Sequence, residues 1–166
     1  MMPVVKVNQL MRKNGFTLIE ILVVLVIVGI LLVSVAIKAF PDERQVLRQE
    51  AERLALLLEQ ARDEAFLSGR SIAWSTQNAS YTFSRLNAAR EWTAITNNQV
   101  LRLRALPLAV EIVALRINQV KVDPNERLVF SPSGLNLPFA ATLELHGHRI
   151  NLLGDSAGRV QIKDEN

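Results

Sequence analysis

The stretch Lys13-Asn14-Gly15-Phe16-Thr17-Leu18-Ile19-Glu20, with the apolar run to Ile37 that follows it, decides how this chain is organised. From Phe16 to Ile37 there are 22 residues, and Glu20 is the only ionisable one among them. A helix rises about 1.5 Å per residue, so this segment would extend about 33 Å, enough to cross the hydrocarbon core of a bilayer. The sequence therefore predicts a membrane-spanning helix over residues 16–37.

Glu20 is the informative residue of this segment, because an acidic side chain inside a membrane costs about 2.5–3.5 kcal/mol at mid-bilayer and normally marks a function. The twelve Leu, Ile and Val residues between Ile21 and Val33 outweigh that cost. If the chain were cut after Gly15, the new α-amine of Phe16 would lie one helical turn from the Glu20 carboxylate. The carboxylate could pair with that amine or with the amine of a neighbouring chain. An acid merely tolerated near the membrane interface is the alternative.

Residues 13–20 resemble the prepilin peptidase site of type IV pilins and type II secretion pseudopilins. In that family the peptidase cuts after the Gly and methylates the new Phe amine, and the Glu pairs with a neighbouring subunit's amine during assembly. The resemblance implies a leader peptide over residues 1–15, cleavage between Gly15 and Phe16, N-methylation of Phe16 and an assembly role for Glu20.

The charge distribution predicts the orientation of the anchor. Of the 19 Lys and Arg residues, three lie in residues 1–15, and the rest of the chain balances 16 basic against 16 acidic residues. Basic residues flank the cytoplasmic side of a membrane helix, so we expect a cytoplasmic N-terminus and a periplasmic C-terminal domain. A conventional signal peptide cleaved after Ser34-Val35-Ala36 is a competing interpretation, but its apolar region would be long and would begin with Glu20.

An amphipathic helix is predicted within residues 38–69. Pro41 interrupts the first helix, Asp42 can cap a new one, and Gly69 can end it. Apolar residues recur in steps of three and four, which places them on one face. We expect this face to cover a sheet rather than to form a coiled coil. The residues of the face are Leu47, Ala51, Leu54, Leu58, Ala61 and Ala65.

Residues 70–166 have the alternation and the turn residues of short β-strands. A hairpin is predicted around Gln77–Ser80, a strand over Val100–Ala105, and a bend at Asn118-Gln119 within Val110–Val122. No helical pattern intervenes, which favours an antiparallel β-sandwich. The further predicted strands are Ser71–Thr76, Tyr81–Leu86, Trp92–Ile95, Leu128–Ser131, Ala141–Leu145, Arg149–Leu153 and Arg159–Lys163.

Few residues point to catalysis or to a cofactor. His146 and His148 could share one strand face, but the chain has no Cys and no third His, so we expect a solvated turn or strand end. Arg102 and Arg104 form the best local basic pair, and on the predicted strand they would share one face. Two basic residues are few for binding nucleic acid. The aromatic residues are expected in the sheet core or its rim: Trp74, Tyr81, Phe83 and Trp92.

The C-terminal part adds a second resemblance. Phe130-Ser131-Pro132-Ser133-Gly134, the apolar strand after it and Gly158-Arg159-Val160 resemble the GspH/FimT group of pilin-like proteins. The resemblance implies an α+β fold of the type IV pilin kind, in which a long N-terminal membrane-spanning helix continues into an amphipathic helix packed on an antiparallel β-sandwich, the periplasmic β domain over residues 70–166.

The expected function is that of a minor pseudopilin, a non-enzymatic structural subunit of the type II secretion pseudopilus near its tip. The expected partners are other pseudopilins, the prepilin peptidase and the bacterial inner membrane, with no cofactor, metal, nucleic acid or small-molecule substrate. A FimT-like minor pilin of a type IV pilus, with a role in DNA uptake, is the alternative. A membrane-anchored periplasmic hydrolase using His146 and His148 is a third hypothesis, which lacks a nucleophile motif.

Overall fold

The computed structural model describes residues 17–38, 42–107 and 109–165. The chain divides into two compact units, residues 1–41 and 42–166. The first unit contains α1 (Leu18–Lys38). No helix in the described part of the chain combines the length and the apolarity that crossing a membrane requires. The membrane span over residues 16–37 stays a prediction, and the leader, Gly15 and Phe16 lie outside the described residues.

The second unit opens with α2 (Glu43–Ser68). Asp42 caps this helix, because its carboxylate accepts a hydrogen bond from the backbone N–H of Arg44 at 3.1 Å. Gly69 ends it in the left-handed conformation, with φ of 65°. The predicted cap and stop are confirmed, whereas Phe40 and Pro41, where a break is predicted, lie outside the described residues.

In residues 42–107 and 109–165, antiparallel strands form two five-stranded sheets. The first sheet has the order β3-β2-β1-β7, with β4 also paired to β2, and the second has the order β10-β9-β8-β5-β6. The predicted antiparallel β domain is confirmed. The strands are β1 (Ile72–Gln77), β2 (Ser80–Leu86), β3 (Trp92–Ala94), β4 (Arg104–Ala105), β5 (Glu111–Ile117), β6 (Val120–Val122), β7 (Leu128–Phe130), β8 (Phe139–Leu145), β9 (His148–Gly154) and β10 (Val160–Glu165).

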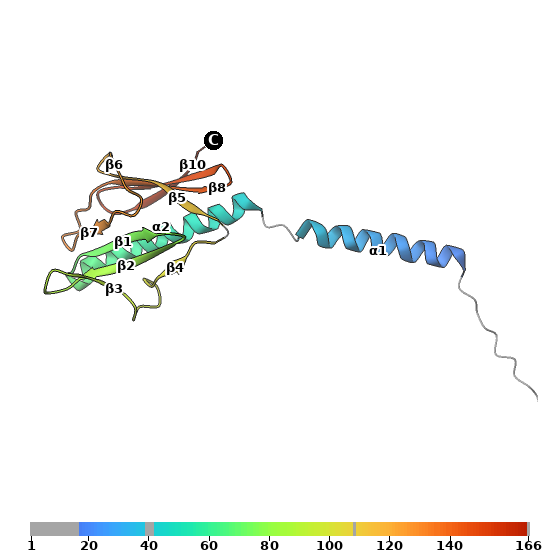
Figure 1. Ribbon diagram of the computed structural model, residues 1–166, viewed down its shortest axis with the longest axis horizontal. Coiled ribbons are helices and arrows are strands. Elements are labelled where there is room, and N and C mark those ends of the chain that lie inside the picture. The colour runs from blue at the N-terminus through green and yellow to red at the C-terminus, as the bar shows by residue number, and fades with distance from the viewer. Residues whose placement is uncertain (1–16, 39–41, 108, 166) are drawn as a thin grey trace, which may run out of the picture. The chain divides into compact units, whose positions relative to one another are not determined.

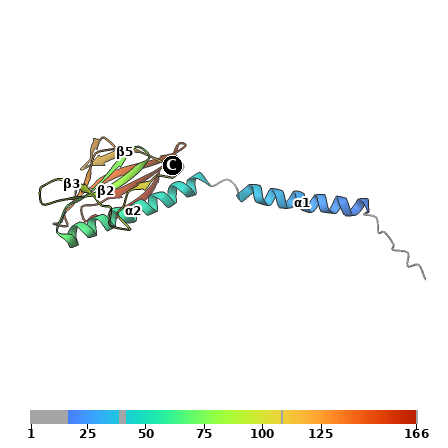
Figure 2. The ribbon, with the colours of Figure 1, turned by 60° about the horizontal axis from the view of Figure 1, so that its bottom comes forward.

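Helix α2 runs along the β domain and packs against strands of both sheets, namely β1 and β7 of the first and β8, β9 and β10 of the second (Figures 1 and 2). All six residues of the predicted apolar face are buried, which confirms that the face covers the sheets. They join one core cluster with Trp74, Tyr81 and Phe83. The prediction that these three aromatic residues belong to the sheet core is therefore confirmed, and Trp92 lies half-buried at the rim.

Two predicted turns have the geometry that their residues favour. Residues 78 and 79 join β1 to β2 as a two-residue turn with Asn78 at φ 52°. Asn118 and Gln119 join β5 to β6, both at positive φ, as a type I′ hairpin turn requires.

The predicted strand over Val100–Ala105 is wrong, because only Arg104 and Ala105 form a strand, β4. The side chain of Asn98 accepts hydrogen bonds from the backbone N–H groups of Val100 at 2.8 Å and Leu101 at 3.1 Å, which folds the chain into a turn. Leu101 is consequently 0% exposed and Leu103 is 65% exposed. In a strand these two residues would share one face.

Candidate functional site

The predicted assembly residue Glu20 lies in the first turn of α1 and is exposed. Thr17 precedes the helix, and its backbone oxygen and Oγ1 accept hydrogen bonds from the N–H of Glu20 at 3.0 and 3.3 Å. Thr17 thus caps α1, and the spacing Thr-x-x-Glu is typical of a helix start. Among the residues described, no side chain or backbone donor contacts the Glu20 carboxylate.

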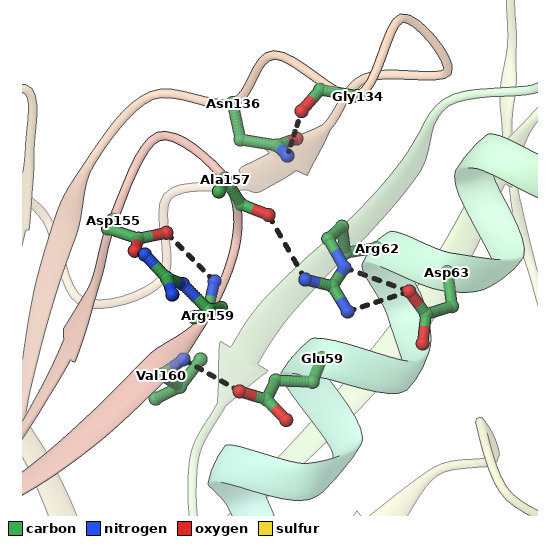
Figure 3. Close-up of polar contacts among 9 residues, drawn as sticks. All are labelled: Glu59, Arg62, Asp63, Gly134, Asn136, Asp155, Ala157, Arg159 and Val160. Carbon is green, nitrogen blue, oxygen red and sulfur yellow. Dashed lines mark hydrogen bonds and ion pairs between the residues drawn. The ribbon is translucent and has the colours of Figure 1, made fainter.

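The two segments that carry the C-terminal resemblance are adjacent in space. The backbone N–H of Asn136, just after Ser131–Gly134, donates to the carbonyl oxygen of Ser156 at 3.0 Å. The side chain of Asn136 is buried and accepts a hydrogen bond from the N–H of Ser131 at 2.9 Å. The side chain also donates to the carbonyl oxygen of Gly134 at 3.3 Å (Figure 3). Asn136 therefore holds the loop after β7 against the loop before β10.

Helix α2 holds this second loop and the start of β10 with two long polar side chains, Arg62 and Glu59 (Figure 3). Arg62 Nη1 donates to the carbonyl oxygen of Ala157 at 3.0 Å. Gly158 lies so close that a Cβ there would stand 2.4 Å from Cδ of Arg62, and its φ is 75°. Only Gly meets both conditions without strain, which explains the glycine of the Gly158-Arg159-Val160 motif structurally.

Glu59 lies outside the predicted apolar face of α2 and has a structural role that sequence reasoning missed. Its Oε1 accepts a hydrogen bond from the backbone N–H of Val160 at 2.8 Å, at the first residue of β10 (Figure 3). Because this partner lies 101 residues away in the chain, no local pattern could reveal it.

We expect Glu59→Ala to lower the free energy of unfolding by about 1 kcal/mol, because the backbone N–H of Val160 loses its acceptor. Glu59→Gln keeps an acceptor oxygen at that place, so it should lower the free energy of unfolding clearly less. Urea unfolding of the fragment 42–166 measures both. Equal stability of the Ala variant and the wild type would show that the contact contributes nothing.

A buried polar cluster connects α2 to the first sheet. Glu50 is 3% exposed, pairs with Arg53, and accepts a hydrogen bond from the Tyr81 hydroxyl at 3.2 Å. Burial raises the pKa of Tyr81 to about 12, and the charge of Glu50 adds to this rise. The hydroxyl therefore stays protonated and remains a donor. The cluster satisfies its own charges, which is typical of a structural contact rather than of a catalytic site.

The remaining candidate residues are dispersed. His146 is exposed in the turn between β8 and β9, with its Nδ1 2.8 Å from Oε1 of Glu43, and His148 begins β9, which confirms the predicted turn and strand end. Within residues 17–38, 42–107 and 109–165, no three His, Cys, Asp or Glu side chains gather to hold a metal. Arg102 lies in a bend and Arg104 in β4, so the predicted shared strand face is wrong.

Two matches to protein families cover complementary parts of the chain. Residues 10–36 match the prokaryotic N-terminal methylation motif, and residues 50–163 match the family described as type II transport protein GspH. A methylation motif ahead of a helix packed on antiparallel sheets defines a pilin-like protein. Since the second match covers most of the chain, this protein belongs to the GspH family of type II transport proteins.

Named relatives agree with this assignment. The type II secretion system protein H of Aeromonas hydrophila is 26% identical over 173 residues, covering 91% of this chain and 93% of that protein. The type II secretion system protein H of Pseudomonas aeruginosa is 30% identical over 150 residues, covering 81% of this chain and 85% of that protein.

Solved structures share the fold. A crystal structure of the minor pseudopilin EpsH of Vibrio cholerae superposes with a TM-score of 0.62 at 17% identity, covering 74% of this chain and 96% of that one. The solution structure of GspH from Escherichia coli superposes with a TM-score of 0.57 at 17% identity, covering 72% of this chain and 89% of that one.

Proposed function

We propose that this protein is a minor pseudopilin, a structural subunit of the type II secretion pseudopilus that assists the export of folded proteins across the outer membrane. One observation carries the proposal: a single chain joins an N-terminal methylation motif to a GspH domain. Relatives aligned over most of their length are named as components of that secretion system. The alternative of a FimT-like minor pilin is not favoured, because both relatives are named as proteins of the type II secretion system.

Its maturation follows from the same motif. The prepilin peptidase removes residues 1–15 by cutting between Gly15 and Phe16, and the new amine of Phe16 is methylated. Residues 16–37 anchor the mature chain in the inner membrane, with the N-terminus cytoplasmic and the β domain periplasmic. The three basic residues of the leader support this orientation.

The role is structural rather than enzymatic, and its partners are the other pseudopilins of the filament and of its tip complex. Two features support this. The polar clusters of the β domain connect its own elements to one another, as Glu59 and Arg62 do for α2 and the loop before β10. The Glu20 carboxylate, by contrast, has no partner in the described residues and is available to a neighbouring subunit.

Deleting the gene for this chain is expected to stop export through the type II system and to leave type IV pili intact. The measurement compares secreted proteins in the culture medium, with piliation and DNA uptake assayed in the same strain. Expression of the wild-type chain in trans serves as the control and should restore export. Loss of pili or of DNA uptake with export unchanged would move the assignment to a minor pilin.

A further inference from the structure

A polar pocket of about 340 Å³ opens at the edge of the first sheet, beside the C-terminal end of α2. Arg70, Arg85, Asn87 and Thr93 line it together with residues 94–97. Two of the lining residues are basic and none is acidic. None of the residues that line this pocket takes part in the contacts of Glu50, Glu59 or Asn136, and neither Arg70 nor Arg85 has a role in the proposed assembly mechanism.

The two arginines have free donor capacity. Arg85 lies opposite Ile72 on β1 and Thr93 on β3. Its Nη2 donates to Oε1 of Glu64 at 2.6 Å, while its buried Nε has no partner in the described chain. A guanidinium carries five N–H donors, so this single bond leaves others unused. Arg70 is exposed, and no acidic group among the described residues pairs with it. Glu64 can neutralise only one of the two charges.

The neighbouring strand β3 has an open edge. In the described sheets β3 pairs only with β2 and is the outermost strand of the path (Figure 1). The N–H of Asn87 donates to the oxygen of Glu91 at 2.9 Å, and the N–H of Ile95 donates to the oxygen of Phe83 at 2.8 Å. Backbone bonds alternate along an antiparallel ladder, so the N–H and C=O groups of Ala94 point away from β2.

We propose that this edge and pocket bind an extended acidic segment of another polypeptide. The segment adds to β3 through backbone hydrogen bonds to Ala94, and one of its carboxylates enters the pocket between Arg70 and Arg85. Main-chain pairing at a sheet edge supplies affinity, and a side-chain pocket beside it supplies specificity. Two guanidinium groups with unused donors favour a carboxylate, which can accept from both at once. The inference rests on the geometry of the β domain and is independent of the secretion assignment.

Fluorescence anisotropy of the full-length chain in detergent micelles tests the carboxylate pocket. The probe is a labelled octapeptide of alternating Thr and Glu, and the matched peptide replaces each Glu with Gln. We expect the Glu peptide to bind at least about tenfold more tightly, since losing a charge-assisted hydrogen bond corresponds to roughly that factor. Arg70→Gln should remove this preference. Arg102 is exposed and does not line the pocket, so Arg102→Gln should retain the preference.

A second variant tests the strand edge separately. Ala94→Pro removes an N–H that faces away from β2 and leaves the β2 ladder intact, so thermal unfolding should be unchanged while binding weakens about tenfold. If Ala94→Pro bound the peptide as tightly as the wild type does, the proposed pairing of the peptide with the edge of β3 would be overturned. Equal binding of the Gln peptide, or retained preference in Arg70→Gln, would overturn the carboxylate pocket. Displacement of the peptide by a single-stranded oligodeoxynucleotide at equal concentration would overturn the acidic peptide as the occupant.

Discussion

Replacing Leu58 with Ala is expected to lower the free energy of unfolding of the β domain by about 2–5 kcal/mol. Leu58 is 0% exposed and belongs to the core cluster formed by α2 and both sheets. The substitution removes buried apolar surface and leaves a cavity, because the surrounding strands are fixed by their backbone ladders and relax only partly. The melting temperature of a domain of this size should fall by roughly 10 °C.

Leu56 provides the matched control for this experiment. It lies two residues away on the same helix and is 68% exposed. Leu56→Ala removes the same atoms with the same change in helix propensity, but it opens no cavity, so its effect should stay within about 0.5 kcal/mol. Urea and thermal unfolding of the fragment 42–166 compare the two variants. A neutral Leu58→Ala variant would mean that this face of α2 does not pack on the sheets in solution.

The parts of this fold that could be predicted from the sequence are those determined by local patterns. The apolar stripe of α2 recurs at six positions in steps of three and four, and both ends of the helix carry residues that favour a cap and a stop. The turns at Asn78 and at Asn118-Gln119 contain residues that tolerate positive φ. In each case neighbouring residues are sufficient to specify the geometry, so distant contacts could only reinforce it.

Where prediction failed, a local signal was outweighed or absent. Leu101 and Leu103 alternate with arginines as in a strand, but the Asn98 side chain turns the backbone before pairing begins. Glu59 occupies a polar helix position, and only the fold brings the N–H of Val160 within 2.8 Å of it. A buried Glu50 contradicts the usual rule for acids on helices. Arg53 on the same helix pairs with its carboxylate, and its second partner, Tyr81, lies on β2.

The candidate sites likewise differ in whether a local sequence pattern reveals them. Gly15, Phe16 and Glu20 form a contiguous motif, which the sequence displays in full and which the methylation-motif match spans. The pocket formed by Arg70 and Arg85 has no such motif. It depends on the end of α2, the pairing of β2 with β3 and the loop after β3, so sequence spacing alone could not indicate it.

Glu20→Val is expected to abolish incorporation of this subunit into a filament while leaving the chain in the membrane. The substitution removes the only acid from the apolar segment, so membrane insertion should be retained or improved. Our proposal gives the carboxylate a neighbouring subunit's amine as its partner. Removing one member of a desolvated ion pair costs about 3–5 kcal/mol, because the other charge is left unpaired. Incorporation should therefore fall by at least about 100-fold.

Three measurements make this prediction specific. Mass spectrometry of the membrane-bound chain should show that wild type and Glu20→Val both begin at methylated Phe16, which separates processing from assembly. Export assayed in the deletion strain should fail with Glu20→Val and with Glu20→Gln, because both lack the charge, and should partly recover with Glu20→Asp. Since the Gln variant keeps a polar side chain of the same length, normal export with it would show that polarity suffices and that no ion pair forms. A Val variant that assembles normally would show that the acid is only tolerated at the start of α1.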